Sequence, residues 1–215
     1  MADKAKYQSF KMLAEKEAEN VDYRIRWRQG TSEIAIMAIH GGGIEPGTTE
    51  IAEAIAGGHH SFYTFSGLKT SGNAVLHITS RRFDEPTGLS MAKNAATIIT
   101  IHGCLEKGRF IYIGGRSTAL KNKIATSLKQ AGYQIDKSSR FPGLSPTNIC
   151  NRCRYKAGVQ LEIAYGLRIQ MFKSLKRHQR DKTNEIFHRF VDAVKEIISP
   201  KKKVLFPPET LLVHI

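Results

Sequence analysis

Unbroken runs of apolar residues recur along the chain and alternate with segments whose apolar residues follow the spacing of a helix. The runs that predict strands lie at residues 33–43, 73–80, 95–103, 108–115 and 158–168. The segments that predict helices lie at residues 48–58, 118–132 and 184–198. Strands without polar alternation are typical of a sheet that helices cover on both faces. We therefore predict an α/β fold, a three-layer α/β/α domain built on a mixed, mostly parallel sheet.

The two ends of the chain are expected to lie outside this core. Residues 1–22 carry alternating charge and few large apolar groups, which predicts a helical or loosely ordered lead-in; YRIRW at 23–27 then favours an edge strand. Prolines interrupt residues 200–215, so this tail is expected to run over the surface. A chain of 215 residues suits one sizeable core, and we predict a single domain over residues 1–215.

Charge and composition restrict the partners. The formal net charge is +14, which attracts a polyanion without saying whether it is nucleic acid, an anionic membrane surface or an acidic polypeptide. No stretch approaches the roughly 20 apolar residues that span a bilayer, and the N-terminal residues are charged where a secretory signal would be apolar. We expect a cytoplasmic monomer without a membrane partner. Three cysteines are too few for a disulfide framework, so stability has to come from the core.

Two of the apolar runs end in a histidine followed by glycine. His40 and His102 each stand where a predicted strand ends, and the strand ends of an α/β sheet are where ligands bind. Glu45 follows His40 across three glycines, before a helix that Thr48 or Thr49 is predicted to cap. Two histidines and a glutamate with an open fourth position suit a catalytic zinc ion. Hydrogen-bonded histidines at the rim of the sheet are the alternative interpretation.

The sequence contains further histidine, cysteine and glycine residues that are weaker candidates for a binding site. His77 falls inside the run at 73–80 and is interpreted as a hydrogen-bonded sheet histidine. Cys150 and Cys153 have the spacing of a metal or redox pair, but no second pair completes a structural zinc site. The glycines at 41–43 match neither of the usual phosphate-binding patterns.

Several longer strings stand out in the sequence, namely AIHGGGIEPGTTEIAEAIAG, FDEP, TIHGC, and NICNR followed by GVQLEIAYGLR. They resemble the zinc-dependent poly-γ-glutamate hydrolases of bacilli and their phages, which are similar to the carboxypeptidase A superfamily. Typical metallocarboxypeptidases separate the first His and Glu ligands by two residues, whereas four residues separate His40 from Glu45. The match is therefore to the smaller polyglutamate-hydrolase group, and the resemblance implies a carboxypeptidase-like fold.

The resemblance also implies roles for individual residues. His40, Glu45 and His102 would hold one zinc ion per chain, and Glu162 would serve as the general base. Asn151 and Arg152 resemble the Asn-Arg pair that holds a substrate carboxylate, a task that suits an Arg fork better than Lys. Arg168 is a further candidate for contact with the acidic substrate. Alternation along the strand supports the role of Glu162, since its neighbours Leu161 and Ile163 would face the opposite layer.

The sequence thus predicts a zinc hydrolase that cleaves the γ-glutamyl amide bonds of poly-γ-glutamate, a polyanion that a chain of charge +14 would attract. A metallohydrolase of another acidic peptide or N-acyl amino acid is one alternative. Another is a basic, phage-related protein that binds nucleic acid or assists replication without catalysis. That alternative shares the charge and the basic stretch FKSLKRHQRDK at 172–182, interpreted as a solvated helix face, but the sequence contains no nucleic-acid-reading motif.

Overall fold

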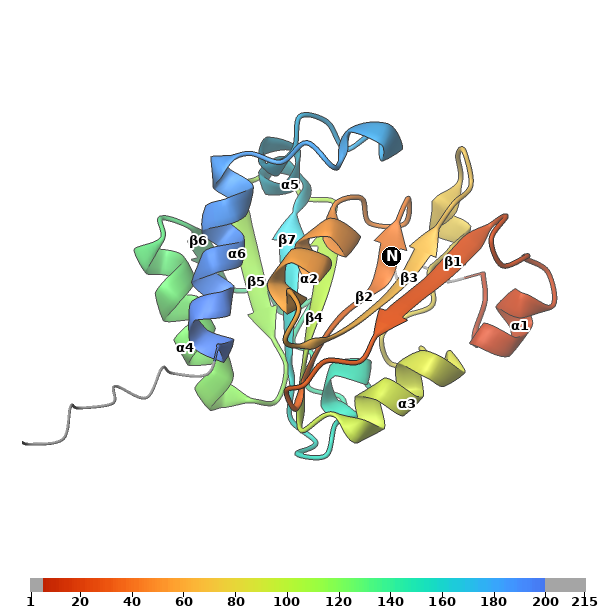
Figure 1. Ribbon diagram of the computed structural model, residues 1–215, viewed down its shortest axis with the longest axis horizontal. Helices are drawn as coiled ribbons and strands as arrows, with labels where there is room; N and C mark the ends of the chain where they lie inside the picture. Colours follow the sequence, from red (N-terminus) through yellow and green to blue (C-terminus); the bar gives the residue numbers. More distant parts are fainter. Residues whose placement is uncertain (1–5, 200–215) are drawn as a thin grey trace, which may run out of the picture.

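The computed structural model describes residues 6–199, and its centre is a seven-stranded sheet with the order β1-β3-β2-β4-β7-β5-β6 (Figure 1). Four of the strand pairings are parallel, and two are antiparallel, β1 with β3 and β5 with β7. The prediction of a mixed, mostly parallel sheet is confirmed. The strands are β1 (Tyr23–Arg28), β2 (Ile34–Gly42), β3 (Ser61–Gly67), β4 (Thr97–Cys104), β5 (Phe110–Gly114), β6 (Gln134–Asp136) and β7 (Val159–Ala164).

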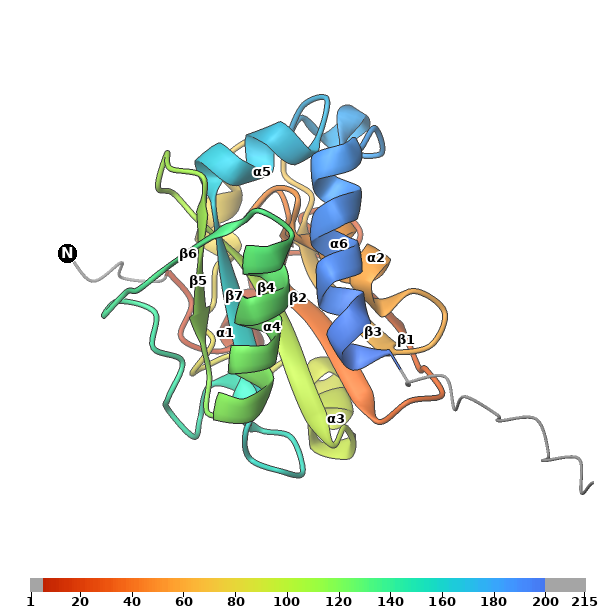
Figure 2. The ribbon, with the colours of Figure 1, turned by 90° about the vertical axis from the view of Figure 1, so that its left-hand side faces the viewer.

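Helices cover both faces of the sheet. Four of them pack on one face, where α4 and α6 lie side by side (Figure 2). Their bounds are α2 (Thr48–Ala56), α4 (Thr118–Gln130), α5 (Tyr165–Met171) and α6 (Glu185–Ile198). The opposite face carries shorter helices: α1 (Phe10–Ala14), the 3-10 turns η1 (Asn73–Leu76) and η2 (Ile149–Asn151), and α3 (Pro86–Asn94). The three-layer prediction is therefore confirmed.

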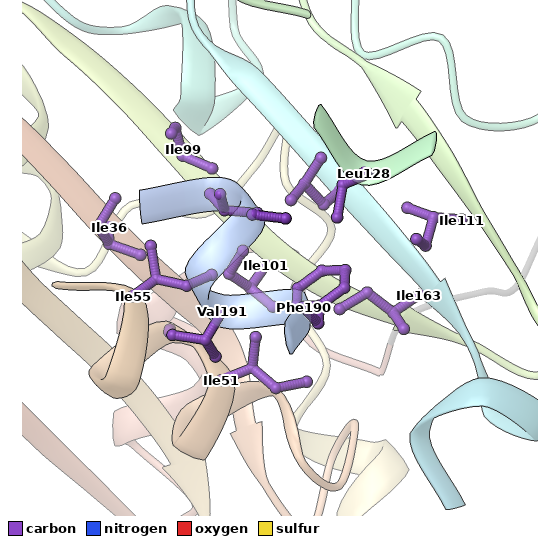
Figure 3. Close-up of a cluster of buried hydrophobic side chains, with 14 of the residues drawn as sticks. Ile36, Ile51, Ile55, Ile99, Ile101, Ile111, Leu128, Ile163, Phe190 and Val191 are labelled. Carbon is purple, nitrogen blue, oxygen red and sulfur yellow. The ribbon is translucent and has the colours of Figure 1, made fainter. Parts of the chain in front are cut away.

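The larger core lies between the sheet and the helices α2, α4 and α6. Successive residues of a strand point to opposite faces, so Ile99 and Ile101 of β4 enter this core while Ile98 enters the other. Figure 3 shows aliphatic side chains from β2, β4, β5 and β7 meeting Ile51 and Ile55 of α2 and Phe190 and Val191 of α6. Because both faces are buried, the central strands contain few polar residues, which explains the unbroken runs.

Several predicted elements are confirmed, with local differences. β1 is the edge strand expected at 23–27, and α2 ends at Gly57. Neither threonine caps α2, because the N-cap is Gly47, whose φ of 96° lies in the left-handed region that suits glycine. In the lead-in, residues 10–14 form α1. The tail at 200–215 lies outside the described residues.

Residues 73–80 were predicted as a strand, and this prediction is wrong. They form η1 and a loop, because their apolar run is short. Its Leu76 packs into the core on one face of the sheet from a 3-10 turn and not from a strand. The strand that pairs between β1 and β2 is instead β3, whose sequence SFYTFSG mixes hydroxyl and aromatic side chains and was missed. None of the helices within residues 6–199 has the length and apolar character that crossing a bilayer requires.

Candidate metal centre

The two strand-end histidines lie on neighbouring strands. β2 and β4 are paired in parallel in the centre of the sheet (Figure 1), so their carboxyl ends meet at one edge. His40 and His102 stand near those ends, and both are buried. The pairing of β2 with β3 shifts register between Ala38 and Gly41, the stretch that contains His40. The sheet itself thus brings the two rings together, with 5.0 Å between their centroids.

Glu45 is brought to the same place by the turn between β2 and α2. Gly42 adopts a φ of 63° there, and the Glu45 N–H donates to the His40 carbonyl at 2.9 Å, which folds the loop back over the strand end. The Gly103 N–H donates to Glu45 Oε2 at 2.8 Å. One carboxylate oxygen is therefore fixed by the strand that carries His102.

The two histidine nitrogens and the two oxygens of the Glu45 carboxylate lie close together. His40 Nδ1 lies 3.0 Å from Glu45 Oε1 and 3.2 Å from His102 Nδ1, and His102 Nδ1 lies 3.6 Å from Glu45 Oε2. Ligands about 2.1 Å from a tetrahedral zinc ion are separated by about 3.4 Å. The spacing of the three groups therefore fits one zinc ion.

Neighbouring groups orient the donors. His40 Nε2 lies 2.7 Å from the Ile78 carbonyl, which can only accept, so this nitrogen carries the proton and Nδ1 presents a lone pair to the centre. Burial works against the ionised form of Glu45, but the electrostatic interaction with the His40 ring and hydrogen bonding with His102 hold its pKa well below the ordinary value. The carboxylate is thus in the form that binds a cation. His102 Nε2 is buried and has no hydrogen-bond partner among the described residues.

His77 also belongs to this cluster, which the sequence did not predict. It follows η1 on a loop rather than lying within a strand, its ring stacks on His40 at 3.9 Å, and its Nε2 lies 3.7 Å from Glu45 Oε1. His40, Glu45 and His77 are close enough together to share an ion. The electrostatic interaction with the His40 ring and burial lower the pKa of His77 to about 3, which keeps it neutral. The only signal in the sequence was a histidine beside a short apolar run.

Glu162 lies next to the cluster on β7. It stands directly opposite His102 in the β4–β7 pairing, and its side chain points away from the core that holds Leu161 and Ile163, as predicted. Burial raises the pKa of Glu162 to about 7, against the opposing charge of His102. A carboxyl group that titrates near neutral pH suits a general base.

The three predicted substrate-binding residues are placed differently. The buried Asn151 amide accepts from the N–H groups of Arg116 and Gly158 and donates to the carbonyls of Gly143 and Ser145, so all its hydrogen-bonding positions are occupied. Its contact with a substrate carboxylate stays a prediction.

The side chains of Arg152 and Arg168 also form hydrogen bonds with backbone carbonyls. The buried guanidinium of Arg168 donates to the carbonyls of Ile163, Pro46 and Cys104, and its contact with the substrate stays a prediction. Arg152 is half-buried and donates to three backbone carbonyls, those of Arg81, Phe83 and Thr147. It fastens the loop whose Ile78 carbonyl orients His40.

Comparison with known proteins identifies relatives of the chain. The family model for poly-gamma-glutamate hydrolase matches residues 7–193. The chain is 35% identical to the UPF0714 protein YndL of Bacillus subtilis (strain 168) over 192 residues, 87% of this chain and 75% of YndL. It is 33% identical to the SPbeta prophage-derived UPF0714 protein YoqZ of the same organism, over 90% of this chain and 72% of YoqZ.

Two solved structures are similar to the whole fold. A bacteriophage poly-gamma-glutamate hydrolase superposes with a TM-score of 0.85 at 34% identity, over 90% of this chain and 96% of that one. A zinc-free form of YndL gives a TM-score of 0.85 at 35% identity, over 91% and 98%. The fold and these matches define an enzyme that hydrolyses amide bonds. More particularly, the chain belongs to the poly-gamma-glutamate hydrolase family.

Proposed function

We propose that the chain is a zinc-dependent hydrolase that cleaves the γ-glutamyl amide bonds of poly-γ-glutamate. The observation that carries the metal assignment is the close approach of three groups: His40 Nδ1 lies 3.2 Å from His102 Nδ1 and 3.0 Å from Glu45 Oε1, and His102 Nδ1 lies 3.6 Å from Glu45 Oε2. These three residues would hold one ion per chain. The family supports the polymer as substrate, and the net charge of +14 suits a chain that carries a carboxylate on every residue.

When bound, zinc supplies Lewis-acid activation of the amide carbonyl and of water. Glu162 takes a proton from the attacking water onto a carboxylate oxygen and then delivers it to the nitrogen of the leaving amine. Burial, which raises the pKa of Glu162 to about 7, allows it both to accept and to return that proton near neutral pH. The Ile78 carbonyl and the Gly103 N–H keep His40 and Glu45 in their orientations throughout.

The proposal is tested by incubating the purified chain with poly-γ-glutamate and following polymer length on a gel. The polymer should become shorter, a chelator should stop the reaction, and added zinc should restore it. Folded protein that contains no metal as purified, and that leaves the polymer unchanged even after zinc is added, would contradict the proposal. Cleavage of another acidic peptide or N-acyl amino acid, but not of the polymer, would show that the substrate is that compound and not poly-γ-glutamate. A salt-sensitive shift of duplex DNA that persists in His40→Ala would favour the nucleic-acid alternative.

A further inference from the structure

The basic stretch at residues 173–182, called here the basic segment, is not the solvated helix face that the sequence suggested. Only η3 (Arg177–Gln179) is helical, and for one turn. The rest is a loop closed at its base, where Phe172 bridges to Thr183 and the Lys173 N–H donates to the Lys182 carbonyl at 2.8 Å. In Figure 1 this loop crosses the upper edge of the sheet, where β2 and β3 end.

Two arginines fasten the basic segment to those strand ends. Arg180 is buried, donates from Nη1 to the Gly42 carbonyl at 2.7 Å and pairs through Nε with Glu50 Oε1 at 3.0 Å. Arg177 donates from Nη2 to the Lys69 carbonyl at 2.9 Å. Gly42 is two residues from His40, so the basic segment is held against the strand that carries a proposed metal ligand.

The base of the loop also packs against the turn that carries Glu45. A Cβ added to Gly47 would lie 2.8 Å from the Phe172 ring and 3.3 Å from the Leu175 side chain. No space therefore separates the turn from these two residues. The basic segment is a fixed neighbour of the metal centre.

The cations that do not anchor the loop are exposed. Lys173, Lys176 and Lys182 are all accessible to solvent. Among the residues that the structure describes, these three lysines have no ion-pair partner. The loop also carries one exposed carboxylate, Asp181, so the three lysines leave it net positive, and net positive charge on a fixed loop raises the local concentration of anions.

We infer that the basic segment is a distal substrate-binding surface, which holds carboxylates of an anionic polymer several residues away from the bond cleaved in the metal centre. The inference rests on the proposed function. A polymer with a carboxylate on every residue can contact several lysines at once while one of its amide bonds lies at Glu162, whereas a short oligomer cannot reach both places. The basic segment therefore favours long chains over short ones.

The chemistry of the loop favours a polycarboxylate over nucleic acid. Single-stranded nucleic acids are held by cations together with aromatic side chains on which the bases stack. The sequence of the basic segment, KSLKRHQRDK, has no Phe, Tyr or Trp, and the adjacent Phe172 is buried. The surface thus offers charge without a stacking platform.

The test compares two variants that lose the same charge. The first replaces Lys173, Lys176 and Lys182 with Gln. The control replaces Lys93, Lys123 and Lys156 with Gln; these lysines are exposed, and Lys93 and Lys156 precede the amino ends of β4 and β7 at the opposite edge. For each protein, kcat/KM is measured on long poly-γ-glutamate and on a γ-glutamyl oligomer of a few residues, at low and at moderate salt.

The ratio of kcat/KM on the long polymer to that on the oligomer should fall about tenfold in the first variant, as expected for three exposed charge contacts. In the first variant this ratio should also lose most of its dependence on salt. The control variant should keep the ratio of the unmodified protein. Equal losses on both substrates, or equal losses in the two variants, would overturn the inference.

Binding separates this inference from the proposed function. Association of fluorescent poly-γ-glutamate with the Glu162→Gln protein should weaken when the three lysines of the basic segment are replaced. If the unmodified chain binds the polymer through these lysines but cleaves nothing, the proposed function fails and the binding surface stands. If replacing them weakens binding of single-stranded DNA and leaves polymer binding unchanged, the inference is overturned.

Discussion

His40 shows how the backbone decides what a side chain can do. Its ring has two nitrogens, and the bond from Nε2 to the Ile78 carbonyl selects the tautomer in which Nδ1 is free to bind a cation. His102 has no comparable partner on Nε2 among the described residues. The first ligand is thus oriented by the loop at 77–83, and the second by its position on β4 between β2 and β7.

Glu162 provides a prediction at the scale of one residue. Glu162→Gln keeps the size and burial of the side chain but cannot accept a proton, so kcat/KM on poly-γ-glutamate should fall by about 10²–10⁴-fold. Zinc content should stay that of the unmodified protein. Glu53→Gln is the matched control, since this partly exposed carboxylate pairs with Arg26 on the surface, and its activity should change little. Comparable activity in the two variants would remove Glu162 from the mechanism.

At the scale of elements, Arg168 links three pieces of the site. From α5 its guanidinium reaches the carbonyls of Ile163 in β7, of Cys104 at the end of β4 and of Pro46 in the turn that carries Glu45. Gly103 is required there, because a Cβ on it would lie 2.4 Å from Arg168 Cζ. Arg168 is therefore a support of the metal centre.

Arg168→Met should lower the free energy of unfolding by about 3 kcal/mol or more, because it leaves three buried carbonyls without donors. Urea denaturation measures this loss, and zinc affinity should fall as well, since the turn around Glu45 loses an anchor. Arg154→Met is the control, because Arg154 forms only an exposed ion pair with Glu33 and should cost little. An unfolding midpoint equal to that of the control would show that Arg168 is not a support.

Elements could be predicted from the sequence where burial on both faces left a clear pattern. β2 and β4 are rich in aliphatic residues, and each carries near its carboxyl end the histidine that the prediction placed at the site. β3 was missed because hydroxyl groups occupy a strand that is buried throughout. Thr64 is accommodated there by bonds to the Ala38 carbonyl, Thr49 and Ser66, which the sequence cannot show.

The site was predicted less completely than the strands. The position of His77 depends on a loop held by long-range contacts, namely the Ile149 N–H on the Ser80 carbonyl and Arg152 on the carbonyls of Arg81 and Phe83. Similarly, the strings around Asn151 and Arg168 identified residues near the site. They did not show that the side chains of these residues form hydrogen bonds with backbone groups. Residue type alone does not say whether a polar group faces a ligand or the protein.

At the scale of the whole molecule, the N-terminal lead-in is joined to the rest by the buried Glu17. This carboxylate accepts from the Tyr7 hydroxyl at 2.5 Å, from Lys69 Nζ at 2.6 Å and from Lys6 Nζ at 3.4 Å. Burial alone would raise the pKa of Glu17, but hydrogen bonds from Lys69 and Tyr7 outweigh it and lower the pKa.

A lowered pKa in the folded state means that Glu17 stabilises the fold above the pKa of an unfolded glutamate, and that this stabilisation is lost as the pH falls below about 4. Glu17→Gln should therefore lower stability by about 1 kcal/mol at pH 7, and the difference from the unmodified protein should close at pH 3. Glu15→Gln is the control, since Glu15 is exposed in the same segment. Thermal unfolding across this pH range checks the prediction, and a difference that persists at pH 3 would contradict it.

The central claim is that His40, Glu45 and His102 hold one zinc ion, and metal content tests it most directly. Zinc per chain should be measured in the purified protein and in His40→Ala, His102→Ala and His77→Ala, after each variant is shown to be folded. We expect about one zinc in the unmodified protein and in His77→Ala, and far less in the other two. A folded unmodified chain without zinc, or full zinc in both His40→Ala and His102→Ala, would contradict the account.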